Sequence, residues 1–211
     1  MTRLSLWPVI FSCVLLTVLS GCRSVTPPVK YYALSAISRT AEEGIVEGNR
    51  PINIGIQPVQ LPGYFNRTQM MTRSGRHELQ VSSLHRWVDY PDRLVQQILG
   101  DNLQVLMPHA RVVNFPWPVG FKPDITVSVH FLELIGTSDG QMLLGAVWRI
   151  TPAGQLSVPS HRTILAEPMP GKGFDDLAAA HSRVLAILCR AVADTLHANQ
   201  EALSGQVPPS D

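Results

Sequence analysis

A long alternation of apolar and polar residues constrains the fold more than any other feature of this sequence. Apolar residues occupy every second position from Ile125 to Phe131, and a second apolar stretch covers residues 142–150. Period-two alternation is typical of a strand with one buried face. Asp139 and Gly140 lie between the two stretches and form a favoured hairpin turn. The sequence therefore predicts a long β-hairpin.

Two segments have the spacing of amphipathic helices. Residues 91–106 place apolar side chains three or four positions apart. This helix starts at Pro91, which suits the first helical position, and Pro108 ends it. The second helix is predicted over residues 174–199, with acidic side chains in its first turn, where negative charge is stabilising.

Shorter runs predict the remaining strands, and turn residues separate them. With two long helices, these strands predict an α+β fold: a single two-layer domain with a mixed, mostly antiparallel sheet and both helices on one face. A length of 211 residues suits one such domain. We place it at residues 30–203, followed by a flexible tail at 204–211. The shorter strands are predicted at residues 31–34, 52–56, 69–73, 77–83, 111–115 and 161–167.

The first 22 residues have the form of a bacterial lipoprotein signal. Residues 4–19 are an uncharged apolar run, shorter than the ~20 residues of a membrane-spanning helix. The Leu-Ser-Gly-Cys sequence that ends at Cys22 resembles a lipobox. We expect a signal peptide over residues 1–21, a lipid-proximal tether over residues 22–29, and a diacylglycerol and an N-acyl chain on Cys22. The alternatives are an ordinary secretory signal and an uncleaved membrane anchor.

Localisation follows from the same segment. Arg23 stands where Asp would retain a lipoprotein in the inner membrane. This favours the outer membrane, with the domain facing the periplasm. Cys13 leaves with the signal peptide and Cys22 is acylated, so Cys189 alone remains and no internal disulfide is expected.

Charge and motif content exclude several classes of function. The 17 basic and 16 acidic residues nearly cancel, so the chain lacks the positive field of a nucleic-acid-binding protein. The sequence contains no Gly-x-Ser-x-Gly and no His-Glu-x-x-His motif, and its histidines are scattered. His181 lies on the apolar face of the second helix, so we expect it to be a core histidine rather than a metal ligand. We therefore expect no enzymatic activity, no metal and no cofactor beyond the lipid.

Motifs in the first half of the chain carry a resemblance to a known family. Tyr-Tyr-Ala-Leu at residues 31–34 is followed by Val-Gln-Leu-Pro-Gly-Tyr at residues 59–64, Thr-Arg-Ser-Gly at residues 72–75 and Arg-Trp at residues 86–87. In this order, after a lipobox, they resemble the ABC-type transport auxiliary lipoproteins. One departure is Asp-Tyr-Pro at residues 89–91, where the family usually has Glu-Pro-Leu.

The resemblance implies a place in a transport system that spans the cell envelope. The partner would be an MCE-domain protein that forms a periplasmic tunnel, and an inner-membrane permease would act indirectly. The lipoprotein would dock the tunnel at the outer membrane as a homo-oligomer, move lipid and help maintain membrane integrity. The alternative is a stand-alone periplasmic lipoprotein that binds a small apolar ligand or acts as a hydrolase.

Six residues are candidates for partner contacts. The apolar loop could form a docking surface, since aromatic side chains provide much contact area, or it could fold back onto the core. The Arg-Trp pair could contact a neighbouring subunit or fix the start of the following helix. The candidates are Leu61, Pro62, Tyr64, Phe65, Arg86 and Trp87.

Overall fold

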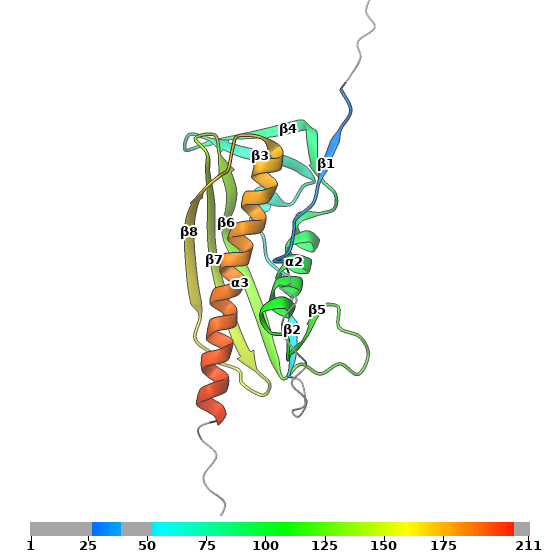
Figure 1. Ribbon diagram of the computed structural model, residues 1–211, viewed down its shortest axis with the longest axis vertical. Coiled ribbons are helices and arrows are strands. Elements are labelled where there is room, and N and C mark those ends of the chain that lie inside the picture. Colours follow the sequence, from blue (N-terminus) through cyan, green and yellow to red (C-terminus); the bar gives the residue numbers. More distant parts are fainter. Residues whose placement is uncertain (1–26, 39–51, 205–211) are drawn as a thin grey trace, which may run out of the picture.

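In the computed structural model, which describes residues 27–38 and 52–204, eight strands form one open sheet and two long helices cover one of its faces (Figure 1). The strands are β1 (Lys30–Tyr32), β2 (Asn53–Ile56), β3 (Gln69–Ser74), β4 (Glu78–Trp87), β5 (Arg111–Asn114), β6 (Ile125–Thr137), β7 (Gln141–Pro152) and β8 (His161–Pro168). The helices are α2 (Pro91–Leu106) and α3 (Phe174–Ser204), and a short 3-10 turn, η1, covers Gly63–Phe65.

Strand β6 organises the sheet. On one side it pairs with β7, which pairs with β8. Its other side is shared: β2 pairs with the beginning of β6, and β3 pairs with its end. Strand β5 lies beyond β2, while β4 and then β1 lie beyond β3. The long pairings, β6–β7, β7–β8 and β3–β4, are antiparallel, and the four shorter pairings are parallel.

The main core lies between the sheet and the helices. Alternate residues of β6 and β7, such as Phe131 and Leu144, point at the helices and are almost fully buried. Leu103 of α2 and Leu185 of α3 meet them from the opposite side. Gly136 of β6 lets α3 approach closely, because a Cβ there would collide with the side chain of Leu177.

The structure confirms the predicted α+β fold with two helices on one face of a mixed sheet. Helix α2 has the predicted bounds, whereas α3 runs on to Ser204. Strand β4 is longer than predicted and includes Arg86 and Trp87, because β1 pairs with its last three residues.

Several predictions lie outside the described residues. The signal peptide, Cys22, most of the tether and residues 205–211 belong to this group. Within the described residues, neither helix combines the length and apolar character needed to cross a membrane.

Candidate functional site

The loop that follows β2 stays beside β6 instead of leaving the sheet. The amide of Gln57 donates to the carbonyl of Val127, and the amide of Gln60 donates to the carbonyl of Val129 at 3.1 Å. The amide of Phe131 in turn donates to the carbonyl of Gln60 at 2.8 Å. The loop thus continues the pairing of β6 up to the point where η1 begins.

Tyr64 occupies the gap between this loop and β3. The ladder of β6 is irregular between Phe131 and Glu133. Just beyond the irregularity, the amide of Leu134 donates to the Tyr64 hydroxyl at 3.3 Å. Burial raises the pKa of Tyr64, so the phenol stays protonated at physiological pH. The side chain supplies an acceptor where no neighbouring strand does.

Phe65, Trp87 and His181 form a buried aromatic cluster. Phe65 stacks on the imidazole of His181 with ring centroids 5.5 Å apart, and Trp87 meets the same ring edge-on at 5.1 Å. Phe65 and Trp87 are only 4% and 3% exposed. They come from η1 and the end of β4, and α3 supplies the histidine between them.

His181 is neutral in this environment. Its Nδ1–H donates to the carbonyl of Leu177 at 2.8 Å, one helical turn earlier. Its Nε2 is buried and has no hydrogen-bond partner within the described part of the chain. Burial lowers its pKa from 6.5 to about 4. These surroundings fit the predicted core histidine.

The six predicted contact residues therefore divide into two groups. Phe65 and Trp87 contact the core. Leu61, Pro62, Tyr64 and Arg86 are half-buried and keep part of their surface exposed. The Arg86 Nε is buried without a partner among the described residues. A contact between any of the six and another protein stays a prediction.

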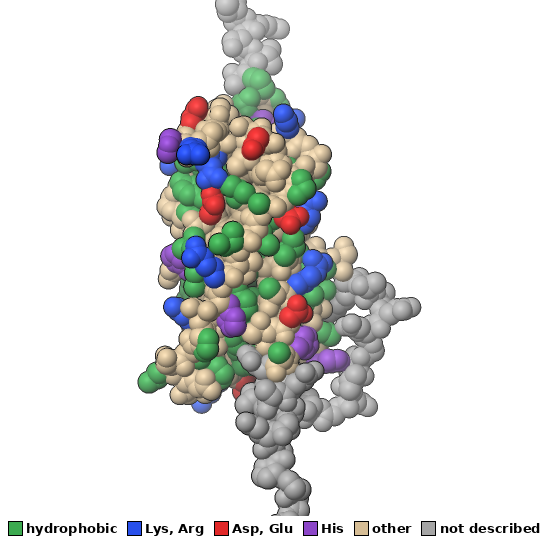
Figure 2. Space-filling model, turned by 90° about the vertical axis from the view of Figure 1, so that its left-hand side faces the viewer, with side chains coloured by type: hydrophobic (Ala, Val, Ile, Leu, Met, Phe, Trp, Pro, Cys, Tyr) green, Lys and Arg blue, Asp and Glu red, His purple; other side chains and the backbone are tan. Residues whose placement is uncertain are grey.

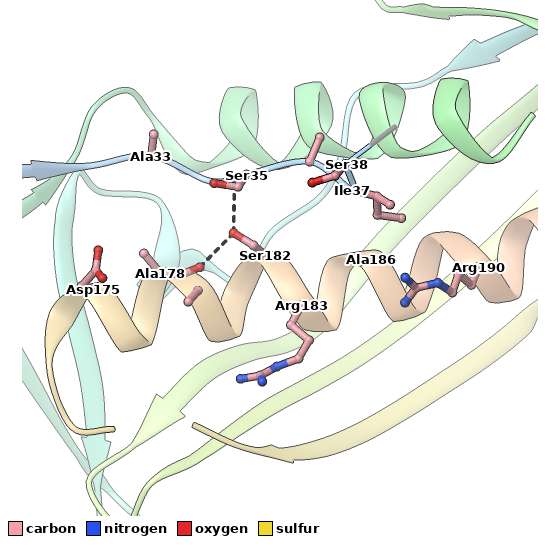
Figure 3. A pocket seen from close by; sticks show the side chains of 12 residues that line it. Ala33, Ser35, Ile37, Ser38, Asp175, Ala178, Ser182, Arg183, Ala186 and Arg190 are labelled. Carbon is pink, nitrogen blue, oxygen red and sulfur yellow. Dashed lines mark hydrogen bonds between the residues drawn. The ribbon is translucent and has the colours of Figure 1, made fainter. Parts of the chain in front are cut away.

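A groove beside α3 was not predicted from the sequence. Residues 33–38 leave β1 and cross the helix layer as an extended strap (Figure 3). The amide of Ser35 donates to the Ser182 hydroxyl at 3.0 Å, and the amide of Ile37 donates to the Asn102 side chain at 2.8 Å. Strap and helix enclose an open groove of about 610 Å³.

Small side chains on α3 form much of the groove. Ala178, Ser182 and Ala186 recur one turn apart along it. The Ser182 hydroxyl donates to the carbonyl of Ala178 at 2.9 Å (Figure 3) while it accepts the Ser35 amide, so both of its roles are structural. Arg183 lies at the rim and donates to the carbonyl of Pro168. The four-residue spacing of these small side chains indicates that another segment could pack closely on this face of α3. The sequence does not reveal that the segment is residues 33–38.

The described part of the chain holds no cluster of three or more histidine, cysteine, aspartate or glutamate residues suited to a metal ion. Cys189 is also inert, since burial raises the pKa of its thiol to about 12. The side of the molecule on which β8 lies shows acidic, basic and histidine side chains dispersed among apolar ones (Figure 2).

Residues 32–193 match the family described as ABC-type transport auxiliary lipoprotein component. The chain belongs to this family. The match covers the strap, the loop around Tyr64, the Arg-Trp pair and most of α3, and it confirms the resemblance of the motifs. The chain is thus a membrane-associated, non-cytoplasmic lipoprotein with a transport-related role. The family is not known as an enzyme family.

Solved structures share the fold of this auxiliary lipoprotein. A crystal structure of an uncharacterised protein is 18% identical, with a TM-score of 0.65, and the match covers 81% of this chain and 99% of that one. The crystal structure of protein XCC0632 from Xanthomonas campestris is 14% identical, with a TM-score of 0.64, and the match covers 83% and 99%. No curated protein matches in sequence.

Proposed function

We propose that this auxiliary lipoprotein is the outer-membrane subunit of an MCE/ABC-type lipid transport system that spans the envelope. It docks the periplasmic MCE tunnel as a homo-oligomer, helps maintain membrane integrity and has no enzymatic activity of its own. The observation that carries the proposal is the order of two features: a lipobox that ends at Cys22, and a family domain that begins only ten residues later, at residue 32 in β1.

The acyl chains on Cys22 would hold the domain at the membrane. Each buried methylene contributes about 0.8 kcal/mol, so several chains give stable attachment. Arg23 in place of Asp supports sorting to the outer membrane. The half-buried side chains of Leu61, Pro62, Tyr64 and Arg86 offer surface for the tunnel protein, beside the buried cluster that fixes the loop.

Lipidation is tested with the variant Cys22→Ala in cells fed a labelled fatty acid. We expect the wild-type protein to carry label and to fractionate with the outer membrane. The variant should carry no label and should leave that fraction. Cys189→Ala is the matched control, because Cys189 is buried and should keep both properties. Label on Cys22→Ala, or wild-type protein in the inner membrane, would contradict this part of the proposal.

The partnership is tested by gentle detergent extraction of the tagged full chain, followed by native mass measurement and identification of the bound chains. An MCE-domain protein that elutes with the lipoprotein supports docking. A monomer that carries only a small apolar ligand overturns it in favour of a carrier.

A further inference from the structure

Exposed apolar side chains line the edge of the sheet where the N-terminal segment enters it. Strand β1 pairs in parallel with the last three residues of β4, and this register, continued by one residue, sets Val88 opposite Ala33. The amide of Val88 donates to the carbonyl of Tyr32 at 2.8 Å, as that continued pairing requires. Side chains at every second position share a face, so Val29, Tyr31 and Val88 point to the same side of this edge.

These side chains are open to solvent. Tyr31 and Val88 are 64% and 58% exposed. Tyr90 follows two residues after Val88, at the start of α2, and is 52% exposed. We call the following four residues the entry patch: Val29, Tyr31, Val88 and Tyr90.

Charged groups of both signs surround the entry patch. The guanidinium of Arg93 lies 6.0 Å from the centre of the Tyr90 ring and pairs with Asp89 at 3.8 Å. Lys30 and Asp92 are exposed beside the patch. Charge alone therefore does not define what the patch contacts. Its tyrosines instead suit a boundary between water and hydrocarbon, because each has an apolar ring and a polar tip.

The entry patch lies close to the expected lipid anchor. Residue 27 is the first that the structure describes, and it follows Cys22 by five positions. An extended chain spans at most about 3.6 Å per residue, so Cys22 lies within roughly 18 Å of residue 27. Acyl chains on Cys22 would hold this end of the domain at the bilayer surface. The connection from β7 to β8 lies at the other end of the long axis (Figure 1).

We propose that the entry patch rests in the interface of the phospholipid bilayer that holds the acyl chains of Cys22, which gives the domain a fixed orientation on the membrane. The proposal rests on the proposed function in one respect, the acylation of Cys22, and it names the surface of the domain that meets the lipid. The tyrosine rings lie at the level of the headgroups with their hydroxyls towards water.

The size of the entry patch fits a tethered contact with lipid better than a contact with a second copy. An aromatic side chain buries roughly 150–250 Å², so the four partly exposed side chains offer about 400 Å², half of the ~800 Å² per partner in a standard protein interface. Strand β1 has three residues and offers little backbone for pairing with another chain. A weak contact suffices beside an anchor, because a short tether gives the second contact an effective concentration in the millimolar range.

The first experiment locates the entry patch relative to lipid in the acylated full chain. A fluorophore on Val88→Cys reports on the patch, and one on Leu156→Cys is the matched control, because Leu156 is 104% exposed on the connection after β7. Cys189 is buried and stays unlabelled. The vesicles consist of phosphatidylethanolamine and phosphatidylglycerol with a spin-labelled phospholipid as quencher. Quenching at position 88 should be about twofold stronger or more than at position 156, and equal quenching overturns the proposal.

The second experiment asks whether the tyrosines make the contact. In the chain labelled at position 88, the double substitution Tyr31→Asp and Tyr90→Asp should lower quenching to the level at position 156. The double substitution to Phe is the matched control, because it keeps both rings and should keep the quenching. Circular dichroism confirms that the variants fold. Unchanged quenching in the aspartate variant overturns the proposal.

Other results separate the entry patch from its alternatives. Energy transfer between labels at position 88 that persists when the protein is diluted into excess lipid assigns the patch to a second copy and overturns the proposal. Equal quenching at the two positions in a chain that floats with the vesicles contradicts only the entry patch. A chain that does not float with the vesicles contradicts the acylation of Cys22 and the entry patch together.

Discussion

At the residue scale, single polar groups complete the structure where regular pairing ends. The Tyr64 hydroxyl accepts the amide of Leu134 at an irregular point of β6. The Asn102 side chain, buried in the helix layer, accepts the amide of Ile37. A buried donor left without an acceptor costs about 1–3 kcal/mol. Tyr64 and Asn102 therefore each contribute to the free energy of unfolding by accepting a backbone amide that would otherwise be unpaired.

The variant Tyr64→Phe tests the first of these groups. Removal of the hydroxyl leaves the amide of Leu134 unpaired and keeps the ring, so the free energy of unfolding should fall by about 1–2 kcal/mol in urea denaturation. Tyr31→Phe is the control, because Tyr31 is 64% exposed and its loss should have little effect. Equal stability of the two variants would show that the hydroxyl contributes nothing.

His181 gives the protein a pH-dependent stability. Its pKa is about 4 when folded and near 6.5 when unfolded, so the unfolded chain binds more protons between these values. Stability from this group is complete above pH 6.5, is lost as the pH falls towards 4 and then levels off. The loss should reach about 3 kcal/mol.

The measurement compares urea denaturation of the wild-type chain and His181→Phe between pH 7 and pH 4. Phenylalanine retains an aromatic ring beside Phe65 and Trp87 but does not titrate. The gap between the two stabilities should change by about 3 kcal/mol in favour of the variant as the pH falls. Parallel curves would mean that His181 titrates normally when folded.

At the element scale, the strongly periodic segments were predictable and the short ones were not. The apolar spacing after Pro91 and the alternation from Ile125 define α2, β6 and β7, because each segment buries one face along its own length. The parallel pairing of β1 with β4 has no such local signal, since three residues carry no usable period. Phe65 and Trp87 pack against His181, which is far away in the sequence. The motifs that contain the two residues therefore could not show whether their side chains are buried or exposed.

The approach of α3 to the sheet depends on Gly136. Alanine there would push against Leu177 and its helix, so Gly136→Ala should lower the free energy of unfolding by about 1–3 kcal/mol. Gly145→Ala is the matched control on the opposite face, where a Cβ meets ordinary contacts. Thermal or urea denaturation of dilute protein checks both variants. A fall of equal size in the two would contradict the close packing of α3.

Two hydrogen bonds hold the strap of residues 33–38. The buried side chain of Asn102 accepts the amide of Ile37, and the Ser182 hydroxyl accepts the amide of Ser35 in an exposed bond. Asn102→Ala should leave the Ile37 amide unpaired and speed its hydrogen exchange at least tenfold, which corresponds to about 1.4 kcal/mol. Ser182→Ala removes the exposed bond to Ser35, where water can replace the hydroxyl, so exchange at Ile37 should stay near the wild-type rate. Slow exchange at Ile37 in Asn102→Ala would show that other contacts hold the strap.

At the scale of the whole molecule, the family match over residues 32–193 places the chain among the transport auxiliary lipoproteins. The two sheet faces differ in kind. One is closed by the helices, while the other has a buried centre and exposed apolar edges. The sequence could not reveal the second face, because its buried residues, Met71 and Ile135, lie on different strands and are brought together only by the register of β3 with β6.

The parallel pairing of β1 with β4 also decides how the domain would respond to mechanical load. The chain enters β1 along the direction of the strand and away from the helices (Figure 1). A pull from a membrane anchor would therefore act along the strand axis, at right angles to the hydrogen bonds. Load of this kind is shared by all the bonds of the pair at once, whereas a pull across the strand would break them one by one. The three-residue pairing of β1 with β4 is thus oriented so that a load applied at the start of β1 would act on it in shear.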